Sequence, residues 1–167
     1  MVASLSEFFN SWEKESESTQ QILEVLTDDS LKQPVSANDR TLGRIAWHIV
    51  TTIPEMISRT GLVLEGTKED APVPSVAKII ADCYREENKA MVTAMSNNWN
   101  DQTLLEERDM YGQTWTIGAT LDALLAHQIH HRGQMTVLMR QAGLNVPGVM
   151  GPSREEWSQF GMEAPLV

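Results

Sequence analysis

A histidine-rich stretch within a long helical pattern constrains this sequence most. The stretch covers residues 127–134 (HQIHHRGQ), and the helical pattern around it runs from about Thr116 to Ala142. On a helical wheel, at about 100° per residue, one face of that helix carries Ile117, Leu121, Leu124, Gln128, His131, Met135 and Leu138. Alternating four- and three-residue steps of this kind are typical of the buried face of a bundle helix. Here the buried face includes a glutamine and a histidine.

His127 lies at the edge of this buried face, one turn before His131, whereas His130 points toward the flank. Histidines at i and i+4 lie on one side of a helix, so His127 and His131 could bind one metal ion together. A single histidine on an apolar face is more often a core residue with one hydrogen bond. Burial of two imidazoles without partners costs about 1–3 kcal/mol each, so that explanation is harder to apply to a pair. A third inward histidine would favour the metal, because catalytic zinc sites use three protein ligands.

The composition narrows the class of protein. A length of 167 residues predicts one domain over residues 1–167, large enough to bury a core. The net charge of −10 and the lack of a basic cluster argue against nucleic acid as a partner. No apolar run reaches the length of about 18 residues that a membrane span needs, so we expect no membrane partner.

Cysteine usage and the start of the chain bear on localisation. The one cysteine, Cys83, excludes a disulfide within the chain and suits a reducing compartment. The first residues lack the basic and apolar regions of a secretory signal. We therefore expect a cytoplasmic protein.

Apolar periodicity predicts four amphipathic helices. We expect them from Ser4 or Ser6 to about Thr27, from about Thr41 to Arg59, from Ser75 to about Met95, and from about Thr116 to Ala142. Asp39 is the expected cap of the second helix. Pro54 is expected to kink that helix or to break its hydrogen bonding near Val50.

The remaining segments are connections. Residues 97–115 have no regular pattern, and residues 110–115 could fold over one end of a bundle. A short helix could begin at Ser153. Because no convincing strand pattern accompanies the four long helices, the sequence predicts an all-α four-helix bundle. The polar connection of residues 61–74 can run the length of that bundle at about 3.3 Å per residue, so the second and third helices could be parallel neighbours.

His48 supplies the third histidine. It lies in the middle of the second helix and shares a face with Ile45 and Glu55. His48, His127 and His131 can therefore meet at a similar depth in the bundle, where three neutral imidazoles would form a metal site with an open position. Imidazole ligands suit Zn²⁺, Ni²⁺, Cu²⁺ or Fe²⁺, and the sequence does not choose among them.

Three further side chains are weaker candidates for this site. Glu55 lies about 10 Å from His48 along the helix axis, so it cannot bind the same ion; it could lie at the rim or support a ligand, but is more commonly an ordinary surface acid. Cys83 could be a thiolate ligand, although a free cysteine is more commonly a small buried hydrophobe. His130 could donate hydrogen bonds near the site or simply be exposed.

Several classes defined by motifs are excluded. Gln128 follows His127, so the His-Glu-x-x-His motif of metalloproteases is absent. No Glu-x-x-His occurs, although the di-iron carboxylate bundles need it. The phosphate-binding motif Gly-x-x-x-x-Gly-Lys-Ser/Thr and the hydrolase motif Gly-x-Ser-x-Gly are also absent.

The histidine-rich stretch closely resembles the DinB family. The resemblance rests on His127-x-x-His130-His131-Arg132-Gly133-Gln134, on Leu138-x-Arg140-Gln141-x-Gly143, and on the following Val146-Pro147. His48, preceded by Ala46-Trp47, is similar to the first metal histidine of that family. The resemblance implies a DinB/YfiT-like bundle in up-down-down-up order, often a homodimer. It also implies a divalent metal, zinc or nickel, on His48, His127 and His131.

The resemblance also implies an activity. Superfamily members with an assigned activity are thiol-dependent S-transferases and isomerases that use low-molecular-weight thiols such as bacillithiol or mycothiol. A metal-dependent S-transferase acting on a small electrophile is therefore the first functional hypothesis, with the thiol in the open coordination position. Gln128 could hydrogen-bond the bound ligand or be a packed amide. Arg132 could anchor a carboxylate of the thiol or form an ion pair at the surface or across a dimer.

Two alternatives remain open at this point. A non-catalytic metal-binding stress-response or interaction protein would use the metal only to tie two helices together, and the lack of a clear general base near the histidines favours it. A metal-free helical dimer would require His48 to face solvent. An open coordination position would favour the enzyme, and a closed site with four ligands would argue against it.

Overall fold

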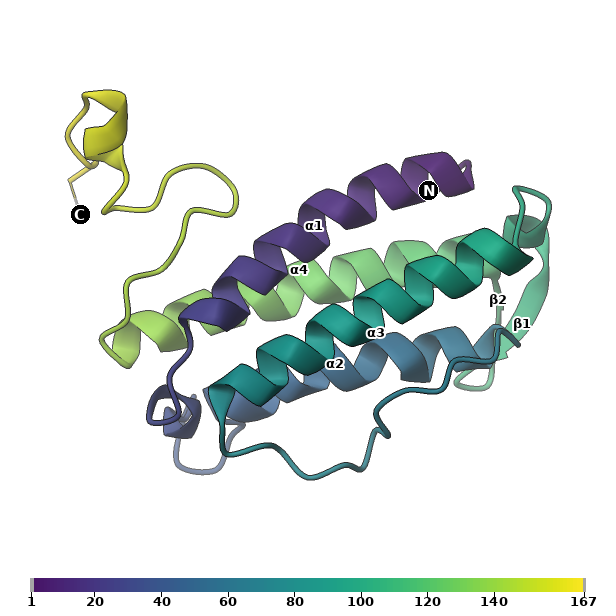
Figure 1. Cartoon of the computed structure of the whole chain (residues 1–167), viewed down its shortest axis with the longest axis horizontal. Helices are drawn as coiled ribbons and strands as arrows, with labels where there is room; N and C mark the ends of the chain where they lie inside the picture. Colours follow the sequence, from purple (N-terminus) through teal and green to yellow (C-terminus); the bar gives the residue numbers. More distant parts are fainter. Residues whose placement is uncertain (1, 167) are drawn as a thin grey trace.

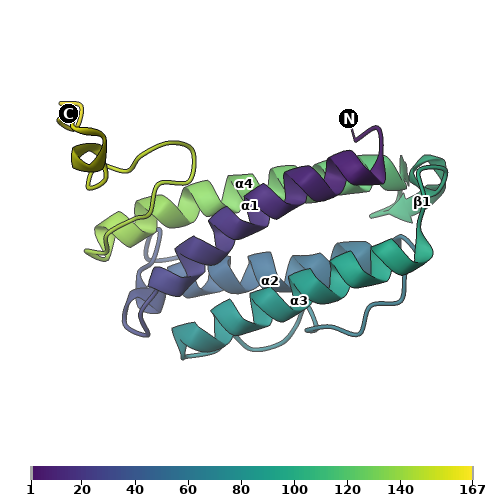
Figure 2. The same cartoon turned by 45° about the horizontal axis from the view of Figure 1, so that its top comes forward.

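Four long helices form the body of the protein. The computed structural model describes residues 2–166, with helices α1 (Leu5–Val25), α2 (Leu42–Arg59), α3 (Ala77–Asn98) and α4 (Ile117–Gln141) packed side by side (Figure 1). Helices α1 and α4 run in one direction, and α2 and α3 run in the other. The all-α four-helix bundle in up-down-down-up order is therefore confirmed. Each of α1 and α2 packs against both α3 and α4, so all four helices enclose one core (Figure 2).

Side-chain caps fix where three of the helices begin. The hydroxyl groups of Ser4, Thr41 and Thr116 accept the N–H of the residue three positions later. The expectation that Asp39 caps the second helix is wrong, because Thr41 holds that position and Asp39 instead accepts from the Ser36 hydroxyl. Helix α2 continues through Pro54 without interruption, so the proline does not end it.

The long connection between α2 and α3 is held at two points. It runs back along the outside of the bundle, as expected for parallel neighbours (Figure 1). The buried carboxylate of Glu87 on α3 accepts the backbone N–H of Thr67 at 2.6 Å and its hydroxyl at 2.7 Å. Further along, the indole N–H of Trp47 on α2 donates to the carbonyl of Ala71 at 3.0 Å. Residues 67–71 are thereby fixed against the helices on both sides.

A β-hairpin occupies part of the segment that the sequence left irregular. Strands β1 (Glu107–Met110) and β2 (Gln113–Thr116) pair antiparallel, with Met110 opposite Gln113. The loop residues Tyr111 and Gly112 have φ angles of 58° and 80°, which suits a tight two-residue hairpin turn. The expectation of no strands is wrong here, because four-residue strands are too short to give a clear alternating pattern. The hairpin does lie at one end of the bundle, against α2 and α4.

The segment after α4 leaves the bundle. Gly143, with a φ of 78°, ends α4 in the left-handed conformation expected there. The short helix expected from Ser153 is a 3₁₀ helix, η3 (Trp157–Phe160), which begins later than predicted. Two hydrogen bonds of 2.7 Å between Arg140 and Glu155 tie this segment back to α4. None of the helices in residues 2–166 has both the length and the apolar character needed to cross a membrane.

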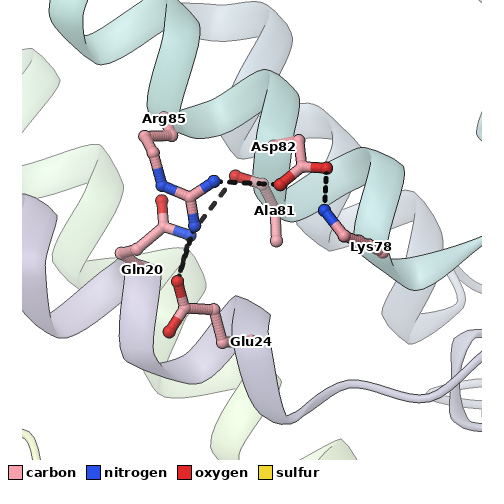
Figure 3. A network of polar contacts seen from close by, with 6 residues as sticks. All are labelled: Gln20, Glu24, Lys78, Ala81, Asp82 and Arg85. Carbon is pink, nitrogen blue, oxygen red and sulfur yellow. Dashed lines mark hydrogen bonds and ion pairs between the residues drawn. The ribbon is translucent and has the colours of Figure 1, made fainter.

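Surface charges link α1 to α3. Arg85 donates to Glu24 of α1 at 2.6 Å and to Asp82 at 2.9 Å, and the Gln20 amide donates to the Ala81 carbonyl at 3.3 Å (Figure 3). Exposed ion pairs of this kind contribute at most about 1 kcal/mol each. Their role is therefore to favour one register of α1 against α3, while the apolar core supplies the stability.

A buried ion pair links α1 to α4. Arg132 is only 2 % exposed, and its guanidinium donates to the Glu15 carboxylate at 2.5 Å and to the Glu15 carbonyl at 2.8 Å. The same group lies 3.3 Å from the Thr19 hydroxyl. Among residues 2–166, the hydrogen bonds of this guanidinium are all with α1, so the arginine fixes α4 against that helix.

We expect Glu15→Gln to lower the free energy of unfolding by about 2–4 kcal/mol, because it leaves the buried Arg132 charge without its counter-charge. Urea denaturation followed by circular dichroism measures this change. Glu17→Gln, an exposed site on the same helix, is the matched control and should cost less than about 0.5 kcal/mol. Equal costs for the two variants would show that the buried pair has no special importance.

Candidate metal centre

Helices α2 and α4 bring three histidine side chains together. His48 Nε2 on α2 lies 3.0 Å from His127 Nε2 on α4. The His131 ring centroid is 4.8 Å from that of His48 and 4.3 Å from that of His127. One nitrogen from each ring lies within 4.8 Å of the other two, so the three residues could hold one metal ion. Bonds of 2.0–2.1 Å place two ligand nitrogens at most about 4 Å apart, so the rings would have to draw slightly closer together to bind one ion.

Neighbouring side chains fix the tautomers of two of these rings. His131 Nδ1 lies 2.7 Å from the amide oxygen of Gln134, which can only accept, so Nδ1 carries the proton and Nε2 keeps its lone pair. The Thr52 hydroxyl donates to the His48 carbonyl at 2.7 Å, and its oxygen lies 3.4 Å from His48 Nδ1. That oxygen can accept the Nδ1 proton of His48 and leave its Nε2 free as well.

The nitrogen atoms of His127 indicate whether a metal ion fits this site. His127 Nδ1 is buried and has no hydrogen-bond partner among residues 2–166, while its Nε2 faces that of His48. Two lone pairs 3.0 Å apart repel each other unless a proton or a metal cation lies between them. A divalent cation bound to all three Nε2 atoms would remove this repulsion, so the donor set fits such an ion.

The three imidazoles are neutral at physiological pH. Burial, followed by the charges of His131, Arg40 and Arg44, lowers the pKa of His48 to about 4. Burial and the neighbouring histidines lower the pKa of His127 to about 3. The pKa of His131 is also lowered, mainly by burial. Neutral imidazole is the protonation state that a metal ligand requires.

Other side chains considered from the sequence lie outside this group. His130 is exposed, with its ring 4.8 Å from that of His131. Cys83 is half-buried on α3, where burial raises the pKa of its thiol and disfavours the thiolate. Glu55 accepts from the Tyr111 hydroxyl at 2.7 Å and pairs with Arg59. It lines the cavity beside the histidines, so it lies at the rim and is not only the surface acid that the sequence favoured.

The two predicted catalytic residues both have partners in the core. The Gln128 side chain is fully buried, and its oxygen accepts from the Tyr84 hydroxyl of α3 at 3.2 Å. Its Nε2 has no partner among the described residues. Arg132 contacts Glu15 of α1 in a buried pair, whereas His127 and His131 of the same helix face α2. A role for either residue in binding a ligand stays a prediction.

A cavity of about 360 Å³ opens beside the histidine cluster. Its lining comes from α2, α4, the hairpin and the long connection, and consists of His48, Thr52, Glu55, Met56, Glu69, Tyr111, Trp115, Ala123 and His127. The sequence reasoning missed the contributions of Glu69, Tyr111 and Trp115. The Tyr111-Gly112 pair was the one sequence signal of a turn that could have indicated the hairpin. No local sequence pattern places Glu69 near His48.

Comparison with known proteins shows the family. The model of the DinB family matches residues 1–164. The chain belongs to the DinB family. It is 50% identical, over the full length of both chains, to the uncharacterized protein YrdA of Bacillus subtilis strain 168.

Solved structures agree with this membership. A DinB-like protein from Bacillus cereus ATCC 10987 matches with a TM-score of 0.86 and 52% identity, over 89% of this chain and 99% of the other. A second DinB-like protein, YjoA from Bacillus subtilis, matches with a TM-score of 0.66 and 19% identity, over 86% and 96% of the two chains. At that identity the second match supports the fold alone.

We expect His131→Ala to abolish stoichiometric metal binding, whereas His130→Ala should retain it, because only His131 faces the cluster. Metal content of untagged protein, measured by mass spectrometry after exposure to zinc or nickel, tests this. About one ion per chain is expected in the parent protein and in His130→Ala, in line with three histidine ligands for one ion. Equal metal content in both variants would contradict the assignment.

We expect Gln134→Ala to weaken metal binding about tenfold, because the Gln134 oxygen holds the proton on His131 Nδ1. Competition with a chromogenic zinc chelator measures the affinity. Gln141→Ala, an exposed amide at the end of the same helix, is the matched control and should leave the affinity unchanged. A tenfold loss in both variants would point to a general effect on α4.

Proposed function

We propose that this DinB-family protein is a metal-dependent enzyme that joins a low-molecular-weight thiol to a small electrophile. The observation that carries the proposal is the opening beside the histidines. His48 and His127 line the cavity of about 360 Å³, so a ligand within it has access to the nitrogen cluster. A catalytic metal site keeps a position for water or substrate, whereas a structural site is closed by four protein ligands. Three imidazoles beside a cavity match the catalytic arrangement.

The side chains of the protein have defined tasks in this proposal. Zinc or nickel is the proposed ion, and when bound it lowers the pKa of a thiol and so supplies a thiolate at neutral pH. Gln134 and Thr52 keep the Nδ1 protons in place, so the Nε2 atoms of His131 and His48 stay available. The unpartnered Nε2 of Gln128 could donate to a ligand while its oxygen stays bound to Tyr84, whereas Arg132 would contact a ligand only if binding released it from Glu15.

A non-catalytic metal-binding or interaction protein is the second candidate. It is favoured by the absence, among residues 2–166, of a further histidine or carboxylate in the cluster that could act as a general base. Glu55, the nearest acid on α2, pairs with Arg59 and Tyr111. A homodimer, implied by the family resemblance, also stays a prediction, and size-exclusion chromatography with light scattering would measure it.

We expect metal-loaded protein to accelerate the reaction of 2-mercaptoethanol with 1-chloro-2,4-dinitrobenzene about tenfold at pH 7. A thiol pKa near 7, compared with about 8.5, raises the thiolate fraction by roughly that factor. The absorbance of the thioether product gives the rate. Metal-free protein and His131→Ala provide the controls, and both should show the uncatalysed rate.

The two candidate functions give different outcomes. Acceleration that depends on both the metal and His131 supports the transferase. In the other outcome, a loaded protein binds one ion per chain and yet accelerates the reaction of the electrophile with neither 2-mercaptoethanol nor cysteine. That result supports the non-catalytic alternative. A protein that takes up no zinc or nickel contradicts both.

A further inference from the structure

The cavity beside the histidines has an acidic wall on a segment whose backbone is anchored. Glu69 lies on the long connection, between the two anchored residues Thr67 and Ala71. Its carboxylate has no hydrogen bond or ion pair with residues 2–166, although it lines the cavity. Glu55 also lines the cavity, but Arg59 compensates its charge. Arg59 also interacts electrostatically with Glu69, so the two carboxylates and this one guanidinium leave the acidic side of the cavity with one net negative charge.

Two aromatic rings of the hairpin form the adjoining corner. The Tyr111 and Trp115 ring centroids are 6.4 Å apart, and the ring planes meet at 75°. The rings meet edge to face, and the electron-rich face of an aromatic ring attracts ammonium groups. The Tyr111 ring already takes part in such a contact, because the Arg59 guanidinium carbon lies 4.4 Å from its centroid. The bond from the Tyr111 hydroxyl to Glu55 holds this ring against α2.

The opposite side of the histidine cluster carries positive charge. Arg44 lies one turn before His48 on α2, and Arg40 precedes the helix. Neither guanidinium has a hydrogen bond or ion pair among the described residues, whereas the other six arginines do. The charge of Arg40 reaches all three histidines. A ligand at the cluster that carries a cationic group is therefore repelled on one side and attracted to the cavity on the other.

We propose that the cavity formed by Glu69, Glu55, Tyr111 and Trp115 selects a ligand whose metal-binding atom is followed by an ammonium group. The proposal rests on the proposed function, because it names the class of molecule that occupies the open side of that same site. The ammonium group would lie in the aromatic corner beside Glu69, two or three bonds from the atom that faces the histidines. The cavity volume of about 360 Å³ accommodates a small molecule of this kind.

Three thiols with the same two-carbon chain test this inference on the full-length protein loaded with Co²⁺. Thiocholine carries a cationic head group, 2-mercaptoethanol a neutral one and 2-mercaptoethanesulfonate an anionic one. The sulfur-to-cobalt charge-transfer band in the near ultraviolet reports binding without any need for catalysis. Dissociation constants are compared between variants for each thiol, so differences in intrinsic thiol acidity cancel.

We expect Glu69→Gln to raise the dissociation constant of thiocholine about fivefold. The dissociation constant of 2-mercaptoethanol should change by less than about twofold. Glu65→Gln is the matched control, because Glu65 is an exposed acid on the same connection that does not line the cavity. Tyr111→Leu should weaken thiocholine binding about threefold, whereas Tyr111→Phe keeps the ring and should retain most of the affinity.

Each outcome separates this inference from the proposed function. A selective loss of thiocholine affinity in Glu69→Gln supports the cation preference. If all three thiols give the band and Glu69→Gln affects them equally, the cation preference is wrong and the open metal site stands. If cobalt binds but no thiol gives the band, the proposed function fails, and the inference that rests on it fails too.

Discussion

The contact between α2 and α4 places three imidazoles in a partly buried site, and the rest of the candidate centre depends on that contact. Burial keeps the rings neutral, and Gln134 and Thr52 orient two of them. Without a cation, a proton between the His48 and His127 Nε2 atoms leaves the buried His127 Nδ1 as an unpaired acceptor, and without that proton two lone pairs face each other, so a divalent ion suits the site. On the other side of α4, the buried pair of Arg132 with Glu15 holds the same helix against α1. Helix α4 is thus fixed on one side by apolar packing and an ion pair, while its histidines remain available on the other.

The open side of the site is made by segments other than the two ligand-bearing helices. The long connection contributes Glu69 and the hairpin contributes Tyr111 and Trp115, and each segment is tied to α2 through Trp47 or Glu55. The helices therefore set where an ion would bind, and the connections set which molecule can approach it. This division is common in proteins that place variable loops on a rigid scaffold.

Sequence periodicity was sufficient for the bundle and for the convergence of the histidines, because both follow from the 3.6-residue repeat of long helices. The same reasoning failed where structure depends on short or distant contacts. The cap at Thr41 was assigned to Asp39 because both residue types cap helices well. The hairpin was missed because its strands have four residues each. The helical wheel correctly placed Gln128 on the buried face, but it could not show that Gln128 contacts Tyr84 of α3 or that Arg132 contacts Glu15 of α1, because those partners are distant in sequence.

The facing histidines His48 and His127 are 79 residues apart in the chain. During synthesis on the ribosome, His48 emerges long before its two partners, and for that whole interval it is a single imidazole with little affinity for an ion. The three nitrogens come together only after α3, the hairpin and much of α4 have been made. An ion in the cell therefore meets a nearly complete bundle, and its insertion is a late step of maturation that leaves the early order of folding to the apolar core.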